Sequence, residues 1–270
     1  MSDSIITSSL PTGKNHISYS EYSDWARCSW KHRLKHVKKL GADDESPYLV
    51  FGSIVHDCCE NILKSGSYNK DELVSFLEKN WLHDHPKFVD WKIGKAIQEA
   101  TDILNEVPAF LAQRFPNWSL FGAETYLYEP LDNHPDVSFK GYVDCIISVP
   151  NKSGDNTLWV LDWKTSNRGW FSEKRRDAIL LGQVILYRNI LSKKHNFVER
   201  DAKCGYVVLN RSGKPGAKCD LVTVSAGPIT INKTLKVLNN SIASLKRGIA
   251  IKNKGDACKY CEFKETIHCP

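Results

Sequence analysis

The sequence predicts an α/β fold in which a mixed central β-sheet is flanked by helices. Three observations lead to this prediction. Apolar residues recur at helical spacing through residues 18–118. From Phe121 the chain changes to short runs rich in β-branched and aromatic residues, with turn formers between them. Helical spacing then returns at Asp177–Leu191. Helices, strands and helices in this order are expected of a layered α/β domain.

Length and composition fit one large domain, or one domain with a helical addition. The chain has 270 residues, 41% of them hydrophobic, which suffices for a core. We divide it into a flexible N-terminal tail (1–17), a helical part (18–118), a core (119–252) and a C-terminal cysteine segment (253–270), against which Cys28 packs. The formal net charge of +6 suits a polyanionic partner without requiring one.

Composition also indicates in which cellular compartment the protein is expected. No apolar run approaches the roughly 18 residues of a membrane span, and the N-terminus lacks the charged and apolar regions of a signal peptide. The odd count of nine cysteines argues against a secreted disulfide framework. We therefore expect a cytoplasmic protein in a reducing compartment, with no membrane partner.

Four helices are expected before the strands, at Tyr19 to about Leu40, 47–65, 71–81 and 92–114. Basic residues crowd the C-terminal half of the first helix. They either complement the carboxyl end of that helix or form a face that follows phosphates. His56 lies on the second helix, where a lone histidine is more often a packed core residue than a ligand.

The second half of the chain is expected to alternate strands with helices. The expected elements are strands at 121–128, 138–149 and 157–165, a helix at 177–191, strands at 204–209 and 220–224, and an amphipathic helix from Ile229 to about Ile251. The polar segment 151–156 is typical of a hairpin loop that joins two antiparallel strands.

Two carboxylates and one lysine stand out in the strand region. Asp144 closes the segment 141–144, and Asp162-Trp-Lys164 follows an apolar run. Asp162 and Lys164 share one face of an extended strand, with Trp163 on the other. Oxygen ligands of this kind suit a hard cation that polarises a phosphate and activates water. The Lys164 ammonium could hold that water or stabilise charge on the phosphate.

The Asp-x-Lys pattern alone is not specific, because charged residues are common and the chain has three copies of it. Only the copy at Asp162 follows an apolar run and precedes Gln183-x-x-x-Tyr187, whose two side chains share a helix face. The copy at Asp90 repeats the same Asp-Trp-Lys tripeptide, and we expect it to lie in a solvated loop.

Over about residues 18–269 these motifs resemble the PD-(D/E)XK nuclease superfamily, and within it the RecB-type nuclease branch. The matching residues are His56, Glu124, the segment 141–144, Asp162 with Lys164, and Gln183 with Tyr187. The third motif has Asp where many members have Glu. The resemblance implies a restriction-endonuclease-like core.

The same resemblance implies roles for these residues. Mg²⁺ or Mn²⁺ would be bound by His56, Asp144 and Asp162, together with the backbone carbonyl of Trp163. Lys164 would be catalytic, and Gln183 with Tyr187 would position the DNA. Glu124, on the preceding strand, is either a further acidic member of the site or an exposed strand residue, and we favour a supporting role.

The C-terminal segment carries Cys258, Cys261 and Cys269 in the spacing C-x2-C-x7-C, and Cys28 is the natural fourth thiol. One early and three late cysteines resemble iron–sulfur RecB-type nucleases, including the CRISPR-adaptation-type exonucleases, which implies a [4Fe-4S] cluster. Zinc on the same thiols, or with His268 in place of one, is the first alternative. Free thiols without metal are the second.

The implied function is a metal-dependent DNA exonuclease acting on single-stranded or end-frayed DNA, in recombination, repair or CRISPR-type processing. A basic, aromatic loop containing Arg168, Trp170 and Phe171 suits single strands, because bases stack on rings and cations follow phosphates. A homo-oligomer or processing partner proteins would be compatible. A catalytically idle nucleic-acid-binding iron–sulfur module and a redox or electron-transfer protein are the alternatives.

Overall fold

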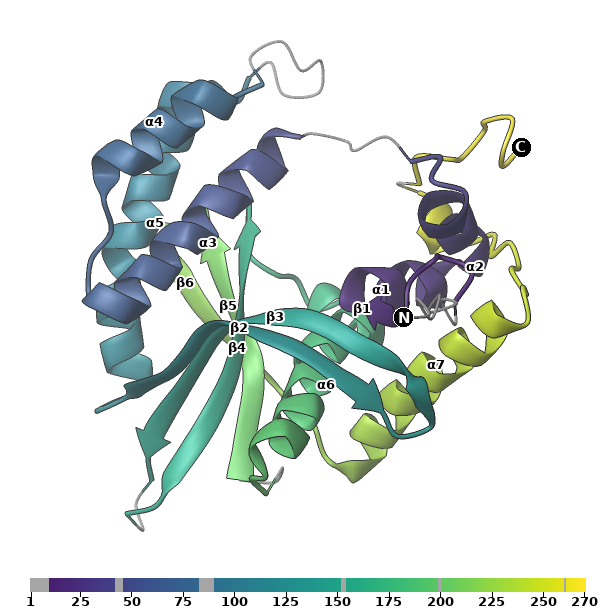
Figure 1. Ribbon diagram of the computed structural model, residues 1–270. Helices are drawn as coiled ribbons and strands as arrows, with labels where there is room; N and C mark the ends of the chain where they lie inside the picture. The colour runs from purple at the N-terminus through teal and green to yellow at the C-terminus, as the bar shows by residue number, and fades with distance from the viewer. Residues whose placement is uncertain (1–9, 42–45, 83–89, 152–153, 199–200, 260) are drawn as a thin grey trace, which may run out of the picture.

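The computed structural model describes residues 10–41, 46–82, 90–151, 154–198, 201–259 and 261–270. Within them a mixed, six-stranded β-sheet is covered by helices on both faces (Figure 1). The predicted α/β fold class is therefore confirmed. In the part of the chain that is described, no helix is long and apolar enough to cross a membrane.

The sheet is organised around one long strand. The strands are β1 (His16–Ser18), β2 (Ser119–Leu131), β3 (His134–Pro150), β4 (Asn156–Ser166), β5 (Ala202–Asn210) and β6 (Cys219–Val224). Their order is β1-β3-β4-β5-β6, with β2 paired to β3 off this path. The β3–β4 and β5–β6 pairs are antiparallel, as are β2–β3, whereas β1–β3 and β4–β5 are parallel. The expected hairpin between the strands of Asp144 and Asp162 is thus present.

The helices divide between the two faces of the sheet. They are α1 (Tyr19–Arg27), α2 (Ser29–His32), α3 (Pro47–Ser65), α4 (Lys70–Asn80), α5 (Ile93–Arg114), α6 (Ala178–His195) and α7 (Pro228–Lys246). One core cluster joins α6 and α7 to one face of the sheet. A second joins α3, α4 and α5 to the other face. The sheet is consequently buried from both sides, which explains the long apolar runs of its central strands.

The single helix expected from Tyr19 to Leu40 is wrong. The chain leaves helical geometry at Cys28, which is extended with φ −161°, and continues as α2 and a π-helical turn at Arg33–Val37. The break coincides with contacts to the C-terminal part of the chain. The Trp30 amide donates to the Ile251 carbonyl at 3.1 Å, and the Asn253 side chain donates to the Arg27 carbonyl at 2.8 Å. Hydrogen bonds to a distant segment replace those of a continuous helix.

Two other expectations need correction. Residues 10–17, expected in a loose tail, include the buried side chains of Leu10 and Thr12 and most of β1. Residues 1–9 of that tail lie outside the described residues. The Asp90 copy of Asp-Trp-Lys is not simply solvated, because Trp91 is buried, lies 3.8 Å under the Arg211 guanidinium and donates to Glu99 at 2.9 Å.

Candidate active site

The two predicted aspartates lie where the β3–β4 ladder ends. The last registered pair before them is Cys145 opposite Leu161, so the next positions are Asp144 and Asp162. Both side chains are buried, with 8% and 1% of their surface exposed. Asp144 Oδ2 accepts a 2.8 Å hydrogen bond from the backbone amide of Trp163. That bond crosses from one strand to the other and fixes the Asp144 carboxylate beside β4.

Lys164 shares the Asp162 side of β4, as strand alternation requires. Its Nζ lies 2.5 Å from Asp162 Oδ2 and 5.9 Å from the centre of the Tyr206 ring on β5. Trp163 points the other way, into the core cluster under α3 and α5. An ammonium group is therefore fixed next to two buried carboxylates.

Burial sets the protonation behaviour of this group. It raises the pKa of Asp144 to about 6 and that of Asp162 to about 6, and the charge of Asp144 adds to the effect at Asp162. Burial alone would lower the pKa of Lys164, but the two carboxylates raise it overall. Lys164 thus stays charged, while the two carboxylates carry more negative charge than one lysine neutralises.

His56 approaches from α3. Its Nδ1 lies 3.4 Å from Asp144 Oδ2, and its side chain is 27% exposed. Burial lowers the pKa of His56 below its usual value, which favours the neutral imidazole that can bind a metal. The structure thus brings together His56, Asp144, Asp162 and Lys164 from three elements.

Gln183 and Tyr187 form a second layer on α6. Gln183 Nε2 lies 3.3 Å from the Tyr187 hydroxyl, and both side chains are buried. Tyr187 packs against β3 at Gly141, where a Cβ atom would lie only 2.7 Å from Cε1 of the ring. Gly141, three residues before Asp144, therefore has a packing role, because the absence of a side chain leaves room for the Tyr187 ring.

Glu124 adjoins the site from β2 without joining its hydrogen bonds. Its backbone has φ +46°, a left-handed conformation inside a strand. Burial, together with the charges of Glu60, Asp57 and Asp162, raises the pKa of Glu124. It is a half-buried acid at the margin of the group.

Two residues near the site were not singled out by the sequence. Tyr206 stands in register with Asp162 on β5 and lies beneath the Lys164 ammonium. Lys174, on a short 3-10 turn before α6, has its Nζ 5.0 Å from the centre of the Trp170 ring, and its pKa is lowered by burial and then by the charge of Lys164. Lys174 was visible as one of several basic loop residues, but nothing in the sequence distinguished it from its neighbours. Tyr206 carried no signal at all.

The chain is similar to a known protein family over nearly its whole length. Residues 16–267 match the family described as the PD-(D/E)XK nuclease superfamily. The chain belongs to that superfamily. Its fold is also that of a solved structure from Eubacterium rectale, described as a "putative exonuclease", with a TM-score of 0.60 and 13% identity over 100% of this chain and 95% of that one. A search of the curated proteins gives no match.

PD-(D/E)XK nucleases typically use Mg²⁺ or Mn²⁺, and the donor types here fit such an ion. Two carboxylates and an imidazole are suitable ligands. Asp162 Oδ2 is buried and makes no hydrogen bond within the described residues, although it is ion-paired to Lys164. Among the described residues, no group of three or more His, Cys, Asp or Glu side chains lies in an arrangement that could hold a metal ion, and this applies to the acidic residues and to the cysteines alike.

The four cysteines predicted to act together line one cavity of about 290 Å³, formed by α2, its following turn and the C-terminal segment of this PD-(D/E)XK chain. Asn253 links two of them: its amide lies 3.4 Å from Cys28 Sγ, and Cys258 Sγ lies 3.3 Å from its carbonyl oxygen. All four thiols are free and half-buried. The remaining cysteines lie elsewhere: Cys58, Cys59, Cys145 and Cys204 are buried, whereas Cys219 is half-buried.

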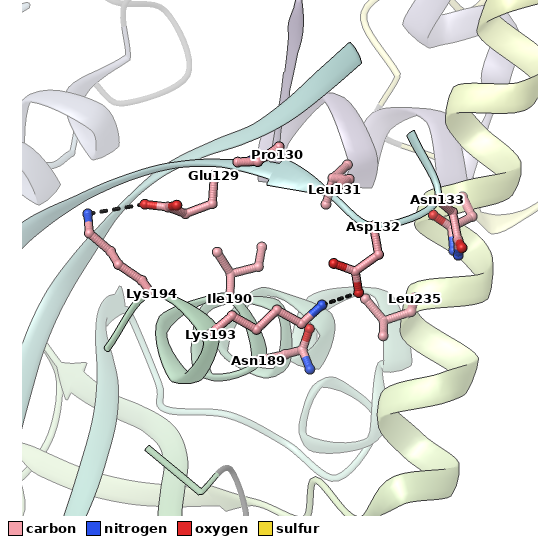
Figure 2. A pocket seen from close by; sticks show the side chains of 11 residues that line it. Glu129, Pro130, Leu131, Asp132, Asn133, Asn189, Ile190, Lys193, Lys194 and Leu235 are labelled. Carbon is pink, nitrogen blue, oxygen red and sulfur yellow. Dashed lines mark hydrogen bonds and ion pairs between the residues drawn. The ribbon is translucent and has the colours of Figure 1, made fainter. Parts of the chain in front are cut away.

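A second cavity, of about 210 Å³, lies between the β2–β3 turn, α6 and α7 (Figure 2). Its charged side chains are paired with each other: Lys193 with Asp132, and Lys194 with Glu129 at 3.5 Å. Because these charges are satisfied internally and none of the predicted site residues lines it, this cavity is not the reacting centre of the nuclease.

Proposed function

We propose that the protein is a metal-dependent deoxyribonuclease of the RecB-type branch, acting as an exonuclease on single-stranded or end-frayed DNA. The observation that carries the proposal is the buried group of Asp144, Asp162 and Lys164 at the end of the β3–β4 hairpin. Burying two carboxylates beside one lysine is unfavourable without a further cation. A site that binds a divalent metal has a physical reason to keep this arrangement.

His56, Asp144 and Asp162, with the backbone carbonyl of Trp163, would hold Mg²⁺ or Mn²⁺. When bound, the ion would polarise the scissile phosphate and lower the pKa of a water molecule. The hydrogen bond from the Trp163 amide to Asp144 orients one carboxylate in advance. The neutral His56 ring leaves a nitrogen lone pair for the ion.

Lys164 would orient the attacking water and stabilise the charge that develops on the phosphate. Gln183 and Tyr187 would position the strand from α6, and Glu124 would add negative charge at the margin. The loop before α6 supports a single-stranded substrate, because it combines the 65% exposed ring of Phe171 with the Lys174 ammonium, which lies 5.0 Å from the centre of the Trp170 ring.

The test is digestion of end-labelled single-stranded and duplex DNA with Mg²⁺ or Mn²⁺, comparing wild type with Lys164→Ala. Lys92→Ala is the matched control, because Lys92 belongs to the second Asp-Trp-Lys tripeptide and is exposed just before α5. We expect cleavage by wild type and Lys92→Ala but not by Lys164→Ala. Equal cleavage by all three would contradict the assignment, and DNA binding without cleavage by the wild type would favour an inactive binding module.

For the cysteine cavity we infer a [4Fe-4S] cluster held by Cys28, Cys258, Cys261 and Cys269. The shared cavity supports this, as do the lysines that line it (Lys31, Lys252, Lys254, Lys264), since four thiolates carry net negative charge around the iron. The cluster would tie α2 to the end of the chain. It would thereby stabilise the fold of a nuclease that acts in recombination, repair or CRISPR-type processing.

Metal analysis of protein purified without oxygen tests the cluster. We expect iron and acid-labile sulfide in wild type, and their loss in Cys258→Ser but not in Cys219→Ser, a half-buried cysteine on β6 away from the cavity. Stoichiometric zinc without sulfide would replace the iron assignment with a tetrahedral zinc site.

A further inference from the structure

The β2–β3 ribbon has an open face that the catalytic group does not account for. Along β3 the odd positions 137–143 are buried against α6, whereas positions 138, 140 and 142 on the other side are half-buried or exposed. Asp144 follows two residues after position 142, where the buried side chains of β3 change from the α6 cluster (Val143) to the cluster on the other face (Cys145). The ribbon extends from the centre of the sheet until its tip meets α7 (Figure 1). One face of it therefore leads away from the candidate active site without a covering helix in the described residues.

This open face carries aromatic rings in contact with one another. The rings of Tyr126 and Tyr142 lie 5.1 Å apart across the two strands, and Tyr126 stacks on Tyr128 with 6.1 Å between centres and 20° between planes. His16 on β1 meets Tyr128 edge-on at 5.6 Å. Tyr126 and Tyr142 are 43% and 50% exposed. Large aromatic groups exposed together are unusual on a soluble surface and mark a binding site.

Positive charge accompanies the rings. Lys140 stands in register between Tyr128 on β2 and Ser18 on β1, so its side chain belongs to the same row. Burial lowers the pKa of His16, Glu21 opposes this, and Lys14 and Lys140 add to the lowering; Lys14 is itself ion-paired to Glu21 at 3.3 Å, which leaves Lys140 as the lysine of this row. A row of stacked rings beside a lysine is the composition that binds unpaired nucleobases and their phosphates.

We propose that Tyr142, Tyr126 and Tyr128 form a stacking platform for unpaired nucleobases of the DNA strand whose phosphate occupies the Asp144–Asp162 site. This rests on the proposed function and adds a substrate-selecting surface to it. Tyr142 is two residues from Asp144 along β3, a separation of about 7 Å. A nucleotide bound at the carboxylates would thus bring its neighbouring base onto the first ring. Paired bases are already stacked and cannot use the platform in this way.

The test measures binding apart from cleavage. In a Lys164→Ala background, the affinity for single-stranded and blunt duplex oligonucleotides is measured by fluorescence anisotropy, with 2-aminopurine in the single strand reporting base stacking. We expect Tyr142→Leu to weaken single-strand binding about tenfold and to relieve the quenching of 2-aminopurine, with little effect on duplex binding. Tyr142→Phe, which keeps the ring, should bind single strands and quench 2-aminopurine as the parent does. Phe121→Leu, an exposed aromatic on β2 beyond Glu124, is the matched control and should bind as the parent does.

Unchanged single-strand affinity and quenching in Tyr142→Leu would overturn the platform, as would an equal loss for single-stranded and duplex DNA. Failure of the proposed nuclease gives a different result. If wild type cleaves no DNA but Tyr142→Leu still loses single-strand binding selectively, the platform stands and the catalytic assignment falls. If wild type cleaves and Tyr142→Leu keeps the same KM for single strands, the platform falls alone.

Discussion

The buried acidic site and the cysteine cavity are built in opposite ways. Asp144, Asp162 and Lys164 lie on neighbouring strands of one hairpin. The two aspartates are no more than 8% exposed. The cysteine cavity joins residue 28 to residues 258–269, and all four of its thiols are half-buried. The first site depends on strand register, and the second on two distant parts of the chain meeting.

Because of this difference, substitutions in the two sites should affect different properties of the protein. A change in the acidic site alters groups that would contact metal and phosphate, while the sheet around it stays packed by two core clusters. A change in the cysteine cavity would remove the link that the proposed cluster makes between α2 and the C-terminal segment, far in sequence from Asp144 and Asp162. The first kind of change should act on cleavage and the second on stability.

The largest effect is expected for Asp162→Asn. The substitution keeps the shape of the side chain but removes one of the two charges that would hold the metal, so cleavage should fall by about 10³-fold. Asp90→Asn, in the second Asp-Trp-Lys tripeptide, should leave cleavage unchanged. Rates of DNA digestion at saturating Mg²⁺ measure the effect, and a rate within tenfold of wild type would remove Asp162 from the metal site.

Acidic pH should produce the next largest effect. Because the pKa values of Asp144 and Asp162 are about 6, protons bind to both carboxylates below that pH and compete with the metal ion. Each of the two carboxylates should cost about tenfold in cleavage per pH unit below 6, so the combined loss should approach about a hundredfold per unit, and added Mg²⁺ should shift the profile to lower pH. A profile that stays flat from pH 7 to pH 5 would contradict these pKa values.

The same pKa values make an opposite prediction for stability. Between about pH 4 and pH 6 the folded, metal-free protein binds more protons at these two carboxyls than the unfolded chain does. The contribution of these two carboxyls to the free energy of unfolding should therefore decrease as pH rises through this window, whereas His32, whose pKa burial lowers to about 4, contributes a slope of the opposite sign. Chemical denaturation of wild type and Asp162→Asn with a chelator present, repeated at several pH values, isolates the carboxyl contribution as the difference between the two slopes, and Mg²⁺ should reduce it.

A smaller effect is expected where Tyr187 packs on β3. In Gly141→Ala the new Cβ atom would lie 2.7 Å from the Tyr187 ring, so the ring must move away from its contact with Gln183. We expect a loss of about 1–3 kcal/mol in stability and a roughly tenfold loss of cleavage. Gly94→Ala on α5, where a Cβ atom meets nothing within 4 Å, is the control and should be neutral or slightly stabilising.

The smallest effect on cleavage is expected for Cys258→Ser. Without the proposed cluster, α2 and the C-terminal segment would be held together by contacts such as the 3.1 Å hydrogen bond from Trp30 Nε1 to the His268 carbonyl. We expect the Tm to fall by about 5–10 °C while the folded enzyme cleaves at a similar rate. Cys219→Ser should melt as wild type does. If Cys258→Ser abolished cleavage in a protein that remains folded, the cysteine cavity would belong to the chemistry and the comparison would fail.

Local pattern determined the elements of this protein and the spacing of its reactive groups. Strand alternation alone predicts that Asp162 and Lys164 share a face while Trp163 points away, and helix periodicity predicts that Gln183 and Tyr187 lie together. The change from helical to strand-like spacing at Phe121 was enough for the α/β class. These predictions succeed because each depends on backbone geometry within a few residues.

Only the tertiary structure decided which distant groups meet. The helix expected at Tyr19–Leu40 is interrupted at Cys28 because Ile251 and Asn253 supply competing hydrogen bonds, and no local signal announces partners more than 200 residues away. Tyr206 comes under Lys164 through parallel register with β4, and the aromatic face arises because β2 places Tyr126 opposite Tyr142. Register between strands and contacts between termini are set by global packing, since they minimise the exposed apolar surface of the whole fold rather than of any one segment.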